Sequence, residues 1–427
     1  MSILNSLYIG ASGMTAHSGA ISTVGDNIAN VSTIGYKRSR ADFADVLGGS
    51  LGGQRLGAGV RLGGPDQLMD QGSLQQTGGA LDLAIRGNGM FAVKGAHDGQ
   101  DRTYFTRDGR FGLDDTGYVS NGGGLRLQGY LIDDTGTVAT TATDLQLGGM
   151  ESPPVATTAA NLSLHLDPSE GTVTWDPTNP GAKTSSNWST TITVRDSLGN
   201  PRNVEVYVCK TGVNTWDWHA MVDGGDVTGG TAGTPQEIAG GTLVFTDGGA
   251  LKTETPGASS VSFTGAAPNQ AIAFDFGDAI DAGGTGRTGT VQTVGDFSVL
   301  GEDIDGRPPG QIIDVQVADD GTVRAAYDNG DSRDVARVAL AMFAAPAELG
   351  RNGDGLYSQS ATSGEPLYGA AGVGGRGAIS GGALESSNVD LGAELVTMIA
   401  YQRAFQANVK TVTTSDEMLA EVANLKR

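Results

Sequence analysis

The chain has 427 residues, of which 48 are acidic and 27 basic, so its formal net charge is −21, and it contains a single cysteine. This charge excludes a general binder of nucleic acid or anionic membranes, which would neutralise phosphates with Lys and Arg. One cysteine excludes a disulfide framework and any multi-cysteine metal site. With 38% hydrophobic residues, a chain of this length is expected to fold into two or more domains.

The first element in the chain is a predicted helix whose seam residues recur at alternating steps of three and four. No Asp, Glu, Lys or Arg occurs between Met1 and Gly25, and the heptad puts Ile9, Ala16 and Thr23 on the outer face, where an isolated coiled coil would carry charge. We infer that protein encloses this helix, and that neighbouring copies of the chain provide the enclosure. An ordinary buried helical hairpin beneath β domains is the alternative. The seam consists of Leu4, Leu7, Ala11, Met14, Ser18, Ile21, Gly25 and Ile28.

A glycine-rich stretch follows this helix. Residues Gly48 to Gly64 include 8 glycines in 17 residues, and a similar stretch, Gly369 to Gly382, lies near the other end of the chain. Both have the composition of extended linkers. Since each one borders a change from helical to β pattern, we expect one helical domain made from both chain ends, with β domains inserted between them.

The middle of the chain has the pattern of β-strands joined by tight turns. Runs such as Thr190 to Val194, Val204 to Val208 and Ile312 to Val317 alternate with turn signals such as Asp320-Gly321. All 14 prolines lie between Pro65 and Pro366, outside the two predicted helical ends. We expect sandwich or barrel-like β domains here.

The last element is a second predicted helix with the same seam spacing. It starts after a cap near Ser386, Ser387 and Asn388, and it places Ala400, Ala407 and Thr414 on its outer face. Two seams in one chain can pair as a coiled coil. The seam consists of Leu395, Met398, Gln402, Phe405, Val409, Val412, Asp416, Leu419 and Ala423.

The predicted fold is therefore multidomain, α plus mainly β, with terminal helices paired as a coiled coil around inserted β-sandwich or barrel-like domains. The expected parts are a helical domain (1–30 and 385–427), a glycine-rich connecting region (31–70 and 369–384), an inner β domain (71–147 and 308–368) and an outer inserted β domain (148–307).

The terminal helices are the predicted assembly surface. Their small, uncharged side chains suit close packing among many helices, and a subunit whose front and back surfaces differ joins head to tail into an open helical filament. The residues predicted to form this interface are Leu4, Leu7, Ala11, Met14, Ile21, Ile28, Leu395, Met398, Phe405, Val409, Val412 and Leu419.

Candidates for catalysis or for metal and cofactor binding are sparse. The four histidines stand in unrelated segments, Cys209 reads as a buried structural thiol, and Gly372 to Gly377 matches a dinucleotide fingerprint only at the rate expected by chance. Asp303 to Gly306 and Asp328 to Asp331 have calcium-loop composition but lack the closing Glu. We expect no enzyme, cofactor or metal. A secreted calcium-binding adhesin or a β-rich polysaccharide-degrading enzyme is the rival class.

Two motifs at the chain ends resemble the flagellar axial family of rod and hook proteins. Asn27-Ile-Ala-Asn30 with Thr33-Ile-Gly-Tyr-Lys37 matches the family's Asn-x-Ala-Asn and Thr-x-Gly-aromatic-Lys, and Gly382 to Leu391 matches its C-terminal motif. Read physically, Asn30 ends the helix and Gly35 takes a left-handed conformation that redirects the chain. Gly78 to Phe91 resembles a block shared by rod and hook members, and the inserted region resembles hook members, whereas a distal rod-type protein is shorter. The motif residues are Asn27, Ala29, Asn30, Thr33, Gly35, Tyr36, Lys37, Ser387, Asn388, Val389, Asp390 and Leu391.

The resemblance implies a structural subunit that assembles with itself into the curved, hollow, flexible hook that transmits motor torque to the flagellar filament. It implies hook cap, distal rod and hook–filament junction proteins as partners. It also implies an extracellular location reached through the flagellar type III export apparatus, in agreement with the absence of a signal-peptide pattern in this sequence. No segment approaches the roughly 18 apolar residues of a membrane span, so we expect no membrane insertion.

Overall fold

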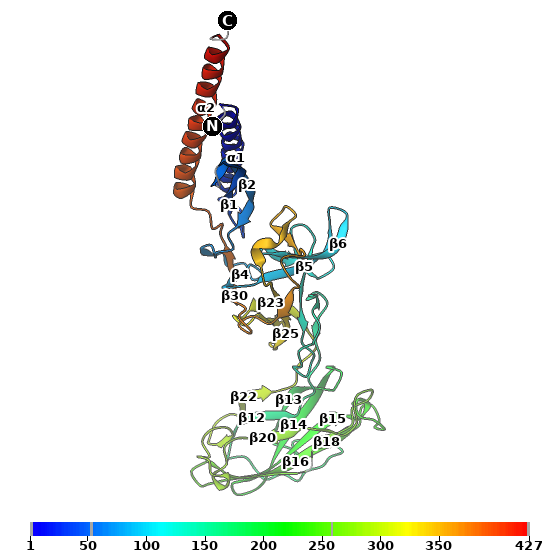
Figure 1. Cartoon of the computed structure of the whole chain (residues 1–427). Coiled ribbons are helices and arrows are strands. Elements are labelled where there is room, and N and C mark those ends of the chain that lie inside the picture. Colours follow the sequence, from blue (N-terminus) through cyan, green and yellow to red (C-terminus); the bar gives the residue numbers. More distant parts are fainter. Residues whose placement is uncertain (1–2, 52–53, 258, 425–427) are drawn as a thin grey trace. The chain divides into compact units, whose positions relative to one another are not determined.

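The computed structural model describes residues 3–51, 54–257 and 259–424. The chain divides into two compact units. Unit 1 comprises residues 1–150, 312–326 and 332–427, and unit 2 comprises residues 151–311 and 327–331. Within unit 1 the N- and C-terminal helices, α1 (Ile3–Ala29) and α2 (Leu391–Asn424), pack side by side (Figure 1). The predicted fold class, paired terminal helices flanking mainly β domains, is confirmed.

The segment after α1 is a long antiparallel hairpin rather than the extended linker that its glycine content predicts. Strands β1 (Ser39–Leu51) and β2 (Gln54–Gln67) pair along most of their length with three irregularities in register. The second glycine-rich stretch is also partly sheet, because β30 (Ala378–Gly381) pairs with β4 (Leu83–Arg86). In both places backbone pairing and contact with a neighbouring element order a sequence whose composition alone indicates flexibility.

The remaining β structure of unit 1 is built around a sheet in which β24, β25, β9, β5, β6, β28 and β27 follow one another. Its core contains Met90, Phe105 and Phe343, with the rings of Phe105 and Phe343 4.7 Å apart edge to face. Strands β23 and β24 lie mostly in unit 1, and the other elements named in the next sentence lie in it entirely. The elements are β3 (Leu74–Gln76), β5 (Met90–His97), β6 (Gln100–Thr106), β7 (Phe111–Leu113), β8 (Val119–Asn121), β9 (Arg126–Leu131), β10 (Thr143–Asp144), β23 (Gly310–Val317), β24 (Thr322–Tyr327), β25 (Ser332–Val338), β26 (Leu340–Met342), η3 (Pro346–Glu348), β27 (Gly350–Arg351), β28 (Leu356–Ser358), β29 (Leu367–Gly369) and β31 (Ala383–Glu385).

Unit 2 is a sandwich-like domain in which two sheets share one core. A five-stranded antiparallel sheet, β13 to β17, faces a four-stranded sheet centred on β12, and Trp216, Trp218 and Phe276 are buried between them. The predicted strands Thr190 to Val194 and Val204 to Val208 lie within β13 and β14. The elements are β11 (Glu151–Ser152), β12 (Ala159–Leu166), β13 (Trp188–Arg195), β14 (Pro201–Gly212), β15 (Thr215–Asp223), η1 (Gly224–Asp226), β16 (Pro235–Phe245), β17 (Leu251–Pro256), β18 (Ser260–Val261), β19 (Gln270–Ala271), β20 (Ala273–Asp275), η2 (Ile280–Ala282), β21 (Val291–Gln292) and β22 (Ser298–Ile304).

Cys209 lies on β14 and is fully buried, on the opposite face of the strand from the core residues Val206 and Val208. Its thiol contacts the carbonyl oxygen of Ser185 at 3.1 Å, and burial raises the pKa of the thiol to about 12. At neutral pH the side chain is therefore a protonated, unreactive buried residue, as the sequence indicates.

Candidate functional site: the terminal helices and their junction

Helices α1 and α2 run antiparallel and approach closely where α1 has glycine. A Cβ atom on Gly10 would lie 2.7 Å from Cγ2 of Val412, and one on Gly13 would lie 2.5 Å from the side chain of Asn408. Further along the pair, the rings of His17 and Tyr401 are 6.0 Å apart. Because real Cβ atoms do not come so close to other atoms, the missing side chains of α1 set the spacing of the pair.

The hairpin β1–β2 packs on α1 and also reaches α2. The ring of Phe43 lies 5.1 Å from that of His17 and 5.8 Å from that of Tyr401, so the three elements meet at these side chains. The hydroxyl of Ser12 accepts a hydrogen bond from the Val60 amide at 3.2 Å. The hairpin thus covers one side of the helix pair.

The buried face of α1 differs by one position from the predicted seam. Gly10, Gly13, Ala20, Val24 and Asn27 are buried, whereas the seam residues come one position later. Ala16, predicted on the outer face, is only 2% exposed. The expectation for Ala16 was wrong because the buried face of α1 consists mainly of glycine, alanine and asparagine, with Val24 as its larger apolar residue. A search for a periodic row of large apolar residues does not find such a face.

Of the predicted interface residues, Val412 faces Gly10 within the helix contact, and the others differ in exposure. Leu4, Ala11 and Leu395 are exposed. The others are half-buried: Leu7, Met14, Ile21, Ile28, Met398, Phe405, Val409, Val412 and Leu419.

The helix pair also exposes large apolar side chains that the chain's own contacts leave uncovered. Tyr8 is 72% exposed, Val396 68% and Ile399 51%. Leu391, Met418 and Val422 are likewise exposed. Such side chains concentrated on two helices mark a contact surface for another molecule.

The end of α1 is held by its motif residues. Asn27 is buried, accepts a hydrogen bond from the Ser39 amide at 2.9 Å and donates one to the Ser39 carbonyl at 2.8 Å. The Tyr36 hydroxyl donates to Asp26 at 3.1 Å, and burial next to that carboxylate raises the pKa of Tyr36 to about 12. The two side chains therefore fix the direction in which the chain leaves the helix.

Gly35 and Asn30 behave as the sequence predicts. Helix α1 ends at Ala29, and the Asn30 side chain donates to the Asp26 carbonyl at 2.9 Å. Gly35 has φ +68°, and a Cβ there would lie 2.5 Å from the backbone of Arg107. Thr33 donates to the Asn30 side chain at 3.0 Å. The turn after α1 thus requires glycine both for its dihedral angle and for the close approach of the chain.

A buried charge cluster lies where the two chain ends enter the β structure. Lys37 Nζ is 2.6 Å from Glu385 Oε1, with side chains 1% and 0% exposed, and Arg107 lies 2.9 Å from the other oxygen of the same carboxylate. Lys37 also donates to the Asp70 carbonyl at 2.7 Å. Desolvation lowers the pKa of Lys37 while Glu385 opposes that effect. The sequence analysis singles out neither Arg107 nor Glu385, although Glu385 lies in the segment Gly382 to Leu391 that resembles the family.

The C-terminal motif joins the same cluster to α2. Asn388 accepts a hydrogen bond from the Arg38 amide at 2.7 Å and donates to the Leu68 carbonyl at 2.8 Å. The cap of α2 is Asp390 rather than Ser386, Ser387 or Asn388, since its carboxylate accepts from the amides of Gly392 and Ala393 at 2.9 and 3.1 Å. A carboxylate at this end is favoured by the helix dipole. Ala29 and Leu391 are exposed, and Ser387 and Val389 are half-buried.

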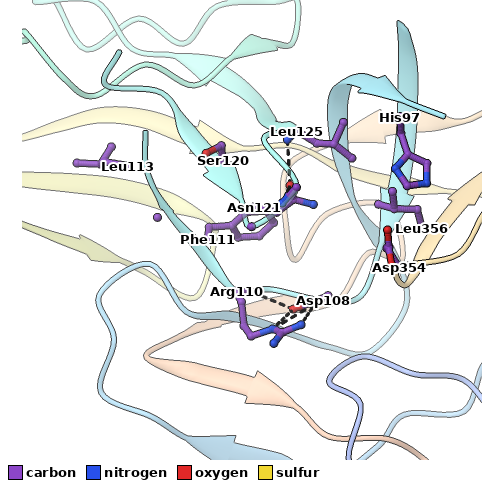
Figure 2. Close-up of a pocket in the computed structure, with 13 residues that line it drawn as sticks. His97, Asp108, Arg110, Phe111, Leu113, Ser120, Asn121, Leu125, Asp354 and Leu356 are labelled. Carbon is purple, nitrogen blue, oxygen red and sulfur yellow. Dashed lines mark hydrogen bonds and ion pairs between the residues drawn. The ribbon is translucent and has the colours of Figure 1, made fainter. Parts of the chain in front are cut away.

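A pocket lies on the β part of unit 1, lined by residues that include His97, Asp108 and Arg110 (Figure 2). Its polar groups serve local structure: Asp108 pairs with Arg110 at 2.6 Å, and the His97 ring contacts the Asn352 carbonyl at 3.1 Å. Across the described ranges, His, Cys, Asp and Glu side chains do not gather in threes as a metal ion would require. Neither described helix carries an apolar stretch of the length needed to cross a bilayer.

Four family descriptions match successive parts of the chain. They are "Flagella basal body rod protein" at residues 7–37, "Flagellar hook protein FlgE/F/G D1 domain" at 84–157, "Flagellar basal body protein FlaE D2 domain" at 156–307 and "Flagellar basal body rod FlgEFG protein C-terminal" at 380–425. The first and last of these regions hold the two helices and their junction. Paired terminal helices around inserted β domains, with these matches, define a flagellar rod or hook protein.

Full-length relatives narrow this class. The flagellar hook protein FlgE of Escherichia coli (strain K12) is 34% identical over 422 residues, covering 97% of this chain and 98% of the relative. The flagellar hook protein FlgE of Rhizobium meliloti (strain 1021) is 35% identical over 438 residues and covers both chains fully. The chain belongs to the flagellar hook protein FlgE family. It is a structural protein of the flagellar hook and not an enzyme, so the distal-rod, adhesin and polysaccharide-degrading alternatives are set aside.

Proposed function

We propose that this chain polymerises head to tail with identical copies into the curved, hollow hook that joins the flagellar motor to the filament. Membership of the hook family supports self-assembly. The observation that carries the proposal is the set of exposed apolar side chains on α1 and α2, among them Tyr8, Val396 and Ile399. Burying such side chains against further copies supplies the main driving force for association.

The predicted interface residues on both helices are part of this proposal. Their half-buried or exposed positions leave apolar surface that a neighbouring copy can cover, and α1 carries no charged side chain before Asp26 that would have to be desolvated. The distal rod, the hook cap and the hook–filament junction proteins are the further partners we propose, together with the flagellar type III export apparatus as the route out of the cell.

Truncation and electron microscopy test the proposal. The full-length protein at high concentration is expected to form curved hollow tubes, whereas variants lacking residues 1–30 or 389–427 are expected to form none. All four tryptophans, Trp175, Trp188, Trp216 and Trp218, lie in unit 2, so an unchanged fluorescence unfolding transition serves as the control that unit 2 is folded. Tubes from either truncated variant, or failure of the full-length protein to polymerise, would contradict the proposal.

A further inference from the structure

The side of the helix pair opposite the hairpin carries mainly apolar side chains that are half-buried or exposed. Successive residues of an α-helix differ by about 100° in direction. Ser12 faces the hairpin and Gly13 faces α2, so Met14 lies a further ~100° round α1, on the side away from the hairpin. Leu7, Ile21 and Ile28 share its heptad position.

Helix α2 contributes to the same side. Tyr401 and Asn408 face α1. Two antiparallel helices are related by a two-fold axis perpendicular to the plane that contains them. On each helix, the residue that follows a contact residue therefore points to the same side of that plane. On α2 these residues are Gln402 and Val409, which follow Tyr401 and Asn408, and Leu395 lies one heptad before Gln402. We call Leu7, Met14, Ile21, Ile28, Leu395 and Val409 the open side; Leu395 is exposed and the others are half-buried.

A second apolar feature on α2 points elsewhere. Ile399 is two positions before Tyr401, about 200° round the helix, and Val396 is five positions before it, about 140° round. Both side chains therefore point away from α1, in agreement with exposed fractions of 51% and 68%. We call Val396 and Ile399 the ridge.

We propose that the ridge of one copy packs into the open side of the next. This inference rests on the proposed function and specifies the contact that performs it. Met398 and Phe405 are half-buried, and helix geometry places them about 60° and about 40° round α2 from Tyr401, between the contact with α1 and the open side. A further helix laid on the open side would therefore extend an apolar surface that begins at the helix pair. The ridge and the open side are different surfaces of one helix pair, and a contact between them is head to tail and propagates as an open helical assembly.

Disulfide crosslinking between variants that each carry one introduced cysteine tests the contact. Cys209 is fully buried, so introduced thiols are the reactive ones. Ile399→Cys is mixed with Leu7→Cys, Met14→Cys, Ile21→Cys or Ile28→Cys, assembled, oxidised and run on a non-reducing gel. A crosslinked dimer is expected from at least one mixture and from none of the variants alone. Ser22→Cys mixed with Ile399→Cys is the matched control and is expected to give no dimer, because Ser22 is exposed but lies ~100° round α1 from Ile21.

Tubes that form normally but give no dimer with any of the four positions would overturn the inference and leave the proposed function standing. Failure of the wild-type protein to form tubes would contradict the proposed function itself. A second measurement covers the case in which a cysteine at position 399 stops assembly. Ile399→Glu is expected to raise the critical concentration for assembly by about tenfold or more, since a buried Ile is lost at each contact. Thr411→Glu, at an exposed position of α2, is expected to leave that concentration nearly unchanged. Equal effects of the two variants would contradict the proposal that the ridge is buried between copies.

Discussion

The Glu385 carboxylate pairs with two buried cations, Lys37 and Arg107, where both ends of the chain meet the β structure. One oxygen accepts from Lys37 and from the Gly72 amide at 2.8 Å, and the other accepts from Arg107. Three segments distant in sequence are therefore joined through one side chain. Removing one member of such a cluster leaves uncompensated charge inside the protein.

We expect Glu385→Gln to lower the free energy of unfolding of unit 1 by about 3–5 kcal/mol, because Lys37 and Arg107 would remain buried without a counter-charge. Denaturation followed by circular dichroism measures this, while tryptophan fluorescence follows unit 2 and is expected not to shift. Asp66→Asn is the matched control: it removes an exposed partner of Arg40 and is expected to cost about 0–1 kcal/mol. An equal decrease in the free energy of unfolding for the two variants would show that the buried cluster contributes no more to stability than an exposed ion pair.

Glu254 in unit 2 gives a pH dependence that can be tested separately. Burial raises the pKa of this carboxyl to about 7 from an ordinary value of 4.5. The folded state therefore binds more protons than the unfolded state between these values, so this contribution to stability is complete below pH 4.5 and is lost as pH rises through about 7. Glu254→Gln is expected to remove this part of the pH dependence of the fluorescence-detected unfolding midpoint. An identical pH profile for variant and wild type would contradict it.

At the scale of elements, the spacing of α1 and α2 depends on residues that lack side chains. A Cβ at Gly10 meets the β-branched Val412 at 2.7 Å, whereas nothing lies within 4 Å of a Cβ at Gly25. The two glycines are on the same helix, so both gain the same helix propensity when replaced by alanine. The difference between the two variants isolates helix packing.

Gly25→Ala is expected to stabilise α1 by about 0.5–1 kcal/mol through helix propensity. Gly10→Ala is expected to be less stable than Gly25→Ala by about 1–3 kcal/mol, because Val412 and the helix behind it must move. Thermal melting followed by the helical circular dichroism signal of the two variants compares them directly. A Gly10→Ala protein as stable as Gly25→Ala would show that the helices do not pack this closely.

The sequence predicts the terminal helices, their pairing and the inserted sandwich, because their periodicity is local and regular. It does not predict the hairpin β1–β2, since the glycines that order it against α1, such as Gly59 beside Ser12, are those that indicate a linker by composition. It does not identify Glu385 either, because only the fold brings that carboxylate to Lys37 and Arg107 from 348 and 278 residues away.

For the whole molecule, charge is separated from the predicted assembly surface. Residues 1–64 carry 5 basic and 3 acidic side chains, residues 383–427 carry 4 and 6, and residues 65–382 carry 18 and 39, which accounts for the entire net charge of −21. Copies that approach through nearly neutral helices therefore bring strongly acidic β regions toward one another. Repulsion between these regions opposes the apolar contact between helices.

Salt is accordingly expected to promote polymerisation. Raising the ionic strength from about 0.01 to 0.15 M shortens the Debye length from about 30 to about 8 Å, which screens the acidic regions and leaves the helix contact almost unchanged. The critical concentration, measured by sedimentation, should fall across this range and level off above it. Ile399→Glu is the informative comparison, because it adds negative charge to the ridge itself and should show a steeper salt dependence. A critical concentration that rises with salt would mean that attraction between opposite charges, rather than burial of the helices, holds the copies together.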